Sequence, residues 1–244
     1  MSTHVSGRVV MRQKWRSLLF LHWPVDPQAV QPLLPSGLEV ECFNNLAYVG
    51  LVCFTMRGIR PLGCPAVRGL SAFHETNVRT YVRYQNRDPG VWFFSLDAAN
   101  RLAVRLARKW FHLPYYDARM FLEREHSSAV GETSSILYSA VRRWPGFDRA
   151  SYQIRAQPTG PIAPARPETL DHFLIERYRL YAKTPRALCS GMVRHPPYLV
   201  QVAEVPLLEE SLIAAAGLRR PPVPPIAHYS GGVDVDVFRL QHVG

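Results

Sequence analysis

The sequence predicts an α+β protein in which antiparallel β-sheet dominates. Many short runs rich in β-branched and aromatic residues are separated by Gly, Pro and Asn, helical patterns are few, and one long β-hairpin is well marked. Such a pattern is typical of a sheet that curls or closes on itself. With 244 residues and 47% hydrophobic content, the chain can bury a substantial core, and we expect a single domain over residues 1–244.

The hairpin occupies Ala72 to Ala98, with a turn expected at 86–90, where Asp, Pro and Gly favour a reversal. That turn would pair Gln85 with Val91, and so would place Arg79 opposite Asp97 and Tyr81 opposite Ser95. Side chains alternate between the two faces of a strand, so this register collects polar groups on one face. The expected polar face consists of Glu75, Asn77, Arg79, Tyr81, Ser95 and Asp97.

This face is either a solvated outer surface or the polar floor of a pocket. The pattern alone favours the solvated surface. A slip of one residue in the register would separate the whole set, because the side-chain period of a strand is two.

The segments before the hairpin follow from the same patterns. Asp26 is suited to cap a short helix that begins at Pro27 and runs to Leu34, since its carboxylate can accept from free N–H groups. Strands are expected at 15–23, 38–42 and 46–57, followed by a loop at 58–70.

After the hairpin, Asp97 is a candidate N-cap for a helix over 98–111, in which Leu102, Leu106 and Trp110 recur at helical spacing. The near-even spacing of Pro158, Pro161, Pro164 and Pro167 indicates an irregular loop over 145–167. Further strands are expected at 117–126, 132–143, 176–183, 187–194, 198–205, 226–230 and 233–240, and short helices at 167–175 and 207–216.

Charge and composition narrow the function classes. The formal net charge is +10, but the chain has only three lysines and its arginines are scattered without a basic block, which argues against nucleic acid and suits an anionic small molecule. We expect no membrane partner and a cytoplasmic location, because no apolar run is long enough to span a bilayer and the N-terminus lacks a signal-peptide core. His and Cys show no metal-ligand spacing and no cofactor-binding glycine motif is present, so we expect neither metal nor cofactor.

A family resemblance becomes visible in the order of several motifs, which lie at 15–38, 73–82, 90–97, 176–181, 195–197 and 228–233. The chain resembles the YqjF-like family of uncharacterised bacterial proteins, also called domain of unknown function 2071, which is placed in the acetoacetate decarboxylase-like superfamily. The resemblance implies a cone-like antiparallel β-barrel with an internal pocket and a few peripheral helices, so that the polar face of the hairpin would point into a pocket.

Acetoacetate decarboxylases have an arginine in the first strand and a glutamate in the pocket, which Arg16 and Glu75 resemble. They also have a Pro-Lys-Lys motif after a helix, whose first lysine forms a Schiff base with the substrate. This chain has Pro114-Tyr115-Tyr116 at that place, and a phenol cannot form an iminium. Decarboxylation by the family's mechanism is therefore not expected.

Two hypotheses remain from the sequence. In the first, the chain is a lyase- or isomerase-like enzyme for a small oxo acid, with Glu75 as general acid/base and Tyr115 polarising a carbonyl. In the second, it is a non-catalytic protein that binds a small ligand on the same fold. Homo-oligomer formation is left open. The expected substrate-binding residues are Arg16, Asn77, Arg79, Tyr81 and Tyr116.

Overall fold

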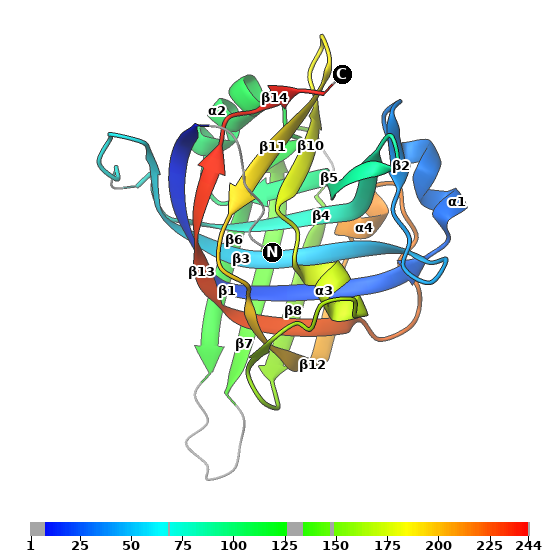
Figure 1. Ribbon diagram of the computed structural model, residues 1–244. Coiled ribbons are helices and arrows are strands. Elements are labelled where there is room, and N and C mark those ends of the chain that lie inside the picture. The colour runs from blue at the N-terminus through cyan, green and yellow to red at the C-terminus, as the bar shows by residue number, and fades with distance from the viewer. Residues whose placement is uncertain (1–7, 68, 126–133, 147–148, 244) are drawn as a thin grey trace.

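A computed structural model describes residues 8–67, 69–125, 134–146 and 149–243 (Figure 1). Within these ranges the strands form one sheet, in which almost all neighbours are antiparallel, and four short α-helices accompany it. The strands are β1 (Val9–Val25), β2 (Leu38–Val40), β3 (Ala47–Pro61), β4 (Phe73–Tyr84), β5 (Arg87–Ala98), β6 (Tyr115–Glu125), β7 (Ser135–Trp144), β8 (Ser151–Pro158), β9 (Ala163–Pro164), β10 (Arg179–Lys183), β11 (Leu188–Arg194), β12 (Leu199–Glu210), β13 (Ile226–Phe238) and β14 (Gln241–His242). The helices are α1 (Pro27–Val30), followed by a 3₁₀ turn at Gln31–Leu33, α2 (Arg101–Phe111), α3 (Leu170–Ile175) and α4 (Leu212–Ala215). None of the helices in the described ranges has the length and apolar character needed to cross a membrane.

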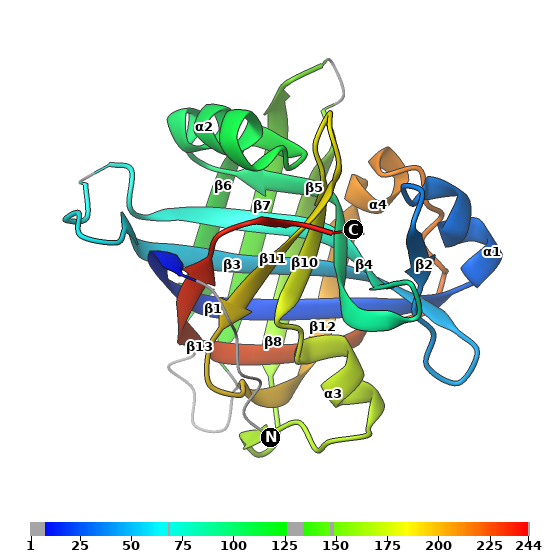
Figure 2. The same cartoon turned by 45° about the horizontal axis from the view of Figure 1, so that its top comes forward.

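The sheet follows a path that returns to its start. Along the path the order is β5-β6-β7-β8-β12-β13-β1-β3-β4, and the additional pairing of β4 with β5 joins its two ends into a ring. Figures 1 and 2 show β10, β11 and α3 on one side of β1, β3 and β4, while β6, β7 and β8 cross on the other side. The predicted mostly antiparallel α+β fold is confirmed.

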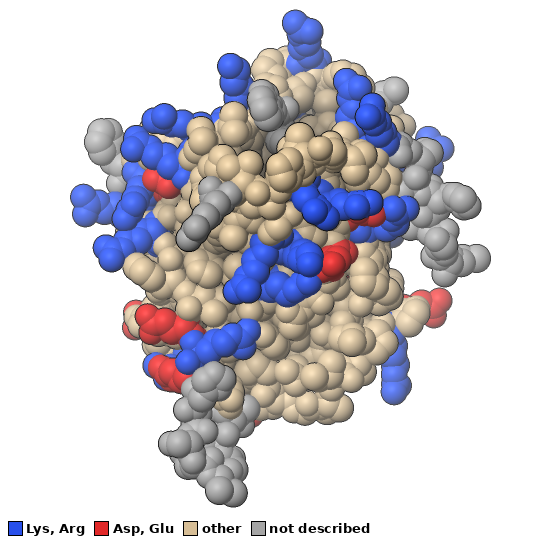
Figure 3. Space-filling view, turned by 90° about the vertical axis from the view of Figure 1, so that its left-hand side faces the viewer, with Lys and Arg blue, Asp and Glu red and all other residues tan. Residues whose placement is uncertain are grey.

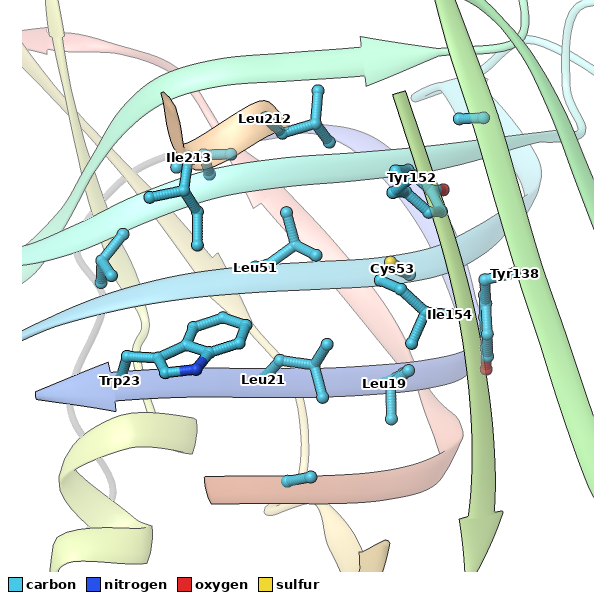
Figure 4. Close-up of a cluster of buried hydrophobic side chains, with 14 of the residues drawn as sticks. Leu19, Leu21, Trp23, Leu51, Cys53, Tyr138, Tyr152, Ile154, Leu212 and Ile213 are labelled. Atoms are coloured by element: carbon cyan, nitrogen blue, oxygen red, sulfur yellow. The ribbon is translucent and has the colours of Figure 1, made fainter. Parts of the chain in front are cut away.

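Two buried clusters of apolar side chains lie on opposite faces of β1, β3 and β4. The first fills the interior of the ring, where Leu19, Leu51 and Val78 pack with Ile154 and with side chains of β6 and β7 (Figure 4). The second lies between the ring and the layer of α3, β10 and β11, and includes Phe20 together with Leu174. Both faces of these strands are therefore buried over their central parts, where a polar side chain on either face lies inside the protein.

The central hairpin forms where the sequence predicted it, but its register differs from the prediction. The turn consists of Gln85 and Asn86 alone, both with positive φ (50° and 57°), as a two-residue reversal requires. Irregularities in the pairing then place Thr76 opposite Asp97 and Val78 opposite Ser95. The expected pairs of Arg79 with Asp97 and of Tyr81 with Ser95 are wrong, because Arg79 pairs with Phe93 and Tyr81 with Val91.

Several boundaries also differ. The expected loop at 145–167 contains β8, whose alternating Tyr152, Ile154 and Ala156 face the core despite the nearby prolines. Asn100, and not Asp97, caps α2 by accepting from the backbone N–H of Ala103. The expected helix at 207–216 is reduced to α4, and the strands expected at 226–230 and 233–240 are one strand, β13. Residues 126 and 132–133 of the expected strands lie outside the described ranges.

Two adjacent glycines in β13 provide a test of how closely β1 approaches β13. Gly232 has φ +131°, and a Cβ there would lie 2.0 Å from the carbonyl oxygen of Trp15, whereas a Cβ at Gly231 would meet nothing within 4 Å. We therefore expect Gly232→Ala to lower the free energy of unfolding by about 3 kcal/mol and Gly231→Ala to change it by less than about 0.5 kcal/mol. Urea unfolding of both variants measures this, and equal effects would contradict the described approach of β1 to β13.

Candidate functional site

A row of four polar residues on β4 faces the layer of α3, β10 and β11. Glu75, Asn77, Arg79 and Tyr81 alternate with Thr76, Val78 and Thr80, which face the interior of the ring. We call these four residues the β4 polar row. All four are buried, so the pattern-based expectation of a solvated surface is wrong. The face lies outside the ring of strands and beneath a second layer, not inside the ring.

Glu75 and Tyr115 form a buried pair at one end of the β4 polar row. The Tyr115 hydroxyl donates a hydrogen bond of 2.9 Å to Oε2 of Glu75, which is 4% exposed. Burial raises the pKa of Glu75 to about 8; the hydrogen bond from Tyr115 opposes this rise and the nearby charge of Asp97 adds to it. Burial and the same carboxyl group raise the pKa of Tyr115 well above its usual value. At neutral pH Glu75 is mostly protonated, so it can act as an acid.

Arg79 and Tyr81 occupy the other end of the row, where both bind the backbone carbonyl of Leu174 in α3. Arg79 Nη2 donates to this oxygen at 3.0 Å, and the Tyr81 hydroxyl donates to it at 2.6 Å. The Arg79 guanidinium also lies 5.7 Å from the ring centre of Phe20. Among the described residues no carboxylate forms an ion pair with Arg79.

Several buried polar atoms on this face have no hydrogen-bond partner among the described residues. They include Oδ1 of Asn77 and Nε of Arg79, which are neighbours in the β4 polar row. A buried donor or acceptor without a partner costs free energy comparable to that of a lost hydrogen bond, and native proteins contain few of them. These two atoms could accept and donate hydrogen bonds to a polar ligand or to water at this face.

Ser95 and Asp97 are not part of this face. Asp97 pairs with Thr76, so its side chain lies on the interior side, where Arg142 of β7 binds both of its carboxylate oxygens at 2.8 and 2.9 Å. The Arg142 guanidinium lies 3.7 Å from the ring centre of Tyr116. Tyr116, expected to bind substrate, thus packs on this ion pair. Sequence reasoning missed Arg142, which is 45 residues from Asp97 in the chain.

Arg16, expected to bind substrate, contacts Asp234. Its guanidinium forms an ion pair with the Asp234 carboxylate and donates to the carbonyls of Trp15 and Val233. About a third of its side chain is exposed. The structure therefore brings together Glu75, Tyr115, Asn77, Arg79 and Tyr81, and places Arg16 and Tyr116 in other contacts.

The three lysines of the chain, Lys14, Lys109 and Lys183, are all exposed. A Schiff-base lysine needs burial or a neighbouring cation that holds its amine unprotonated. On the face of the molecule seen in Figure 3, Lys and Arg side chains lie in several separate groups. None of the three lysines contacts the β4 polar row through a hydrogen bond or ion pair among the described residues.

Two cavities lie away from the Glu75–Tyr115 pair. One, of about 720 Å³, is lined mainly by β6 residues with Arg101 and Trp144; the other, of about 660 Å³, lies along β6, β7 and β8. Neither of these two is lined by the β4 polar row, so the internal pocket implied by the family resemblance stays a prediction. Within the described ranges, no three His, Cys, Asp or Glu side chains are grouped so that they could hold a metal ion.

Several solved structures have a similar fold. An acetoacetate decarboxylase-like enzyme from Sphingomonas wittichii RW1 superposes with a TM-score of 0.63 at 14% identity, over 97% of this chain and 94% of that chain. The acetoacetate decarboxylase from Legionella pneumophila gives 0.65 at 14% identity, over 96% and 87%. The enduracididine biosynthesis enzyme MppR, complexed with pyruvate, gives 0.65 at 10% identity, over 100% and 93%. The protein thus has the acetoacetate decarboxylase-like fold.

Sequence comparison then assigns the chain to a family. The model of the DUF2071 family, described as an uncharacterized conserved protein, matches residues 12–234. The uncharacterized protein YqjF of Bacillus subtilis (strain 168) is 37% identical over 235 residues, which cover 96% of this chain and 93% of that protein. The chain therefore belongs to the DUF2071 family, and the resemblance stated from its motifs is confirmed.

Proposed function

We propose that the protein binds a small oxo acid against the β4 polar row and carries out acid/base chemistry on it without a Schiff base. The observation that carries this proposal is the buried Glu75, whose carboxyl group has a pKa of about 8 and receives the hydroxyl hydrogen bond of Tyr115. A buried acid with such a pKa is common at catalytic sites, because its protonation state changes near the working pH.

Arg79 supports an anionic ligand. A buried guanidinium is costly unless an anion accompanies it, and a carboxylate can accept two hydrogen bonds from one arginine. Glu75 and Arg79 are four residues apart on one strand, so their Cα atoms are separated by about 13 Å. An oxo acid longer than pyruvate would reach from Arg79 past Asn77 to Glu75. In the similar structure of MppR the ligand is pyruvate itself, a small oxo acid.

The chemistry follows from the proton positions. Protonated Glu75, or Tyr115, donates a hydrogen bond to the ligand's carbonyl oxygen and polarises the C=O bond. When Glu75 is ionised, its carboxylate removes a proton from the carbon next to the carbonyl, and the C–H electron pair forms the enolate C=C bond. The Tyr115 hydroxyl then turns from Glu75 to the ligand and donates to the enolate oxygen. Return of a proton to the same or a neighbouring atom completes an exchange or an isomerisation.

A non-catalytic binding protein is the second candidate. The replacement of both lysines of the Pro-Lys-Lys motif by Tyr115 and Tyr116 favours it, since the fold then lacks the nucleophile of the decarboxylases. Both candidates use Arg79 to hold an anion, and they differ only in what Glu75 does.

The test combines binding, exchange and covalent trapping with pyruvate, acetoacetate and 4-oxopentanoate. We expect calorimetric binding that weakens at least about tenfold in Arg79→Met, whereas Arg194→Met, at an exposed ion pair with Asp236, leaves it unchanged. NMR in D₂O should show deuterium entering next to the ligand carbonyl. Borohydride should give no adduct in the intact mass, beside a lysine-dependent decarboxylase as positive control.

Each outcome decides one part of the proposal. Binding without exchange would leave the binding protein, and absence of binding by all three acids would refute an oxo-acid ligand. An adduct at Lys14, Lys109 or Lys183 would show that a lysine forms the Schiff base after all.

A further inference from the structure

Beside the β4 polar row, the same buried face carries two histidines on neighbouring strands. The strand register aligns His228 of β13 with Phe20, Val52 and Asn77 across β1, β3 and β4. The next row on this face consists of Ile226, His22, Gly50 and Arg79. Neighbouring strands are about 4.8 Å apart, so His22 and Arg79 are separated by about 10 Å across the sheet and His228 and Asn77 by about 14 Å. The buried side chains of Phe20 and Val52 lie between His228 and Asn77 in their row.

Gly50 allows the His22 and Arg79 side chains to approach each other. A Cβ at this position would lie 2.9 Å from Cδ2 of His22 and 3.3 Å from Cγ of Arg79. The two side chains therefore converge above a residue that has no side chain of its own. Both histidines lie within family motifs, at 15–38 and 228–233, but sequence reasoning assigned neither of them a role in binding.

The hydrogen bonds of His22 determine which of its ring nitrogens carries the proton. The Tyr81 hydroxyl donates its proton to the Leu174 carbonyl, so at 2.8 Å its oxygen can only accept from Nε2–H of His22. Burial, with the charges of Arg79 and His228, lowers the pKa of His22 well below its usual value. His22 is therefore neutral, and its Nδ1 is a buried acceptor that has no partner among the described residues.

His228 presents the same arrangement. Its Nε2 lies 3.3 Å from Oδ1 of Asp171 in α3, and a carboxylate oxygen can only accept, so Nε2 carries the proton. Burial lowers the pKa of His228, and Asp171 opposes that shift. Nδ1 of His228 is again a buried acceptor without a partner in the described part of the chain.

The unsatisfied groups on this area of the sheet define the chemistry of a ligand. Three of them are acceptors, Nδ1 of His22, Nδ1 of His228 and Oδ1 of Asn77, and one is a donor, Nε of Arg79. A plain carboxylate could satisfy the donor, but it has no hydrogen to give to the acceptors. A ligand that satisfies both kinds carries hydroxyl or amino groups as well as a carboxylate.

We propose that His22 and His228 are specificity-determining residues which bind a hydroxyl or amino group of the ligand, so that the site selects hydroxylated or aminated oxo acids over unsubstituted ones. This inference rests on the proposed function, since it concerns the same ligand. The inference goes beyond the proposed function in two respects. It names the side chains that contact the substituent of the ligand, and it requires that this substituent donate a hydrogen bond to a neutral imidazole.

The test uses pairs of acids that differ by one hydroxyl group, 4-oxopentanoate with 5-hydroxy-4-oxopentanoate and 2-oxobutanoate with 4-hydroxy-2-oxobutanoate. We expect calorimetry to show that the hydroxylated acid of at least one pair binds about tenfold more tightly, as one or two hydrogen bonds to buried acceptors provide. Equal affinity within both pairs would overturn the inference while leaving the oxo-acid site intact. Absence of binding by all four acids would instead count against the proposed function.

Two substitutions of His228 separate recognition from packing. His228→Gln can keep the N–H donor toward Asp171 but removes the acceptor at the Nδ1 position, so we expect the preference for the hydroxylated acid to disappear. His228→Asn can place an amide oxygen near the Nδ1 position, so we expect part of the preference to return. A preference that survives in His228→Gln would overturn the role of His228, and the corresponding His22→Gln variant, which can keep a donor toward Tyr81, tests His22 in the same way.

Discussion

Glu75→Gln is expected to make the folded protein more stable at neutral pH while it removes the proposed acid/base activity. Glutamine has almost the shape of a protonated glutamate and can still accept the Tyr115 hydrogen bond, but it cannot ionise. Because burial raises the pKa of Glu75 to about 8, the native side chain must hold its proton in the folded state at a pH where the unfolded chain releases it.

The sign of the effect follows from proton binding. Between about pH 4.5 and pH 8 the folded chain binds more protons at Glu75 than the unfolded chain does, so its contribution to stability is complete below pH 4.5 and is lost as the pH rises to 8. The advantage of the Gln variant should grow by about 1.4 kcal/mol per pH unit over this range and reach about 3 kcal/mol at pH 7. Urea unfolding of both proteins from pH 4 to pH 8 measures it.

The activity should change in the opposite direction. Deuterium exchange into a bound oxo acid should rise with pH as Glu75 ionises, level off above about pH 8, and fall by about 10²- to 10⁴-fold in Glu75→Gln. Glu39→Gln, at an exposed glutamate of β2, is the control and should change neither property. An advantage of the Gln variant over the unsubstituted protein that is no larger at pH 7 than at pH 4 would contradict the raised pKa of Glu75.

In the central hairpin, sequence patterns predicted the face of β4 correctly but not the register of β5. Alternation along β4 identified the residues that share a face with Glu75, since that depends only on neighbours in one strand. The partner strand was misplaced because a two-residue turn at Gln85 and Asn86, and irregular pairing beyond it, were not visible in the composition of the turn. Ser95 and Asp97 were therefore assigned to the wrong face, as a shift by an odd number of residues requires.

Contacts between residues far apart in the chain could not be predicted from sequence patterns either. Tyr115 joins Glu75 across 40 residues, and it was found only because a family motif pointed to it. Arg142 lies outside the family motifs, and the motifs at 15–38 and 228–233 contain His22 and His228 without assigning either of them a role. Each of the three reaches its partner through sheet pairing and packing that a single sequence does not encode locally. Arg16 matched the family pattern in position, yet its guanidinium binds Asp234, a residue of the adjacent strand β13.

Asp97→Asn is expected to destabilise the fold more than any surface charge substitution. The side chains of Asp97 and Arg142 are 1% and 2% exposed, and their two hydrogen bonds join β5 to β7 through the interior of the ring. Removing one partner of a buried pair leaves the other charge buried, which typically costs about 3–5 kcal/mol. Asp234→Asn, whose carboxylate pairs with Arg16 but is 64% exposed, should cost less than about 1 kcal/mol in the same urea experiment.

Asp97→Asn should also change the pKa of Glu75 in the proposed site. The negative charge of Asp97 contributes to the raised pKa of Glu75, after the larger effect of burial. In Asp97→Asn the pKa of Glu75 should therefore move down, and the pH at which deuterium exchange levels off should fall with it, provided that the measurement is made at a temperature where the variant is folded. An unchanged profile would show that burial alone sets the pKa of Glu75. A downward shift would make Asp97, on the far face of the sheet, a residue that tunes the acid on the near face.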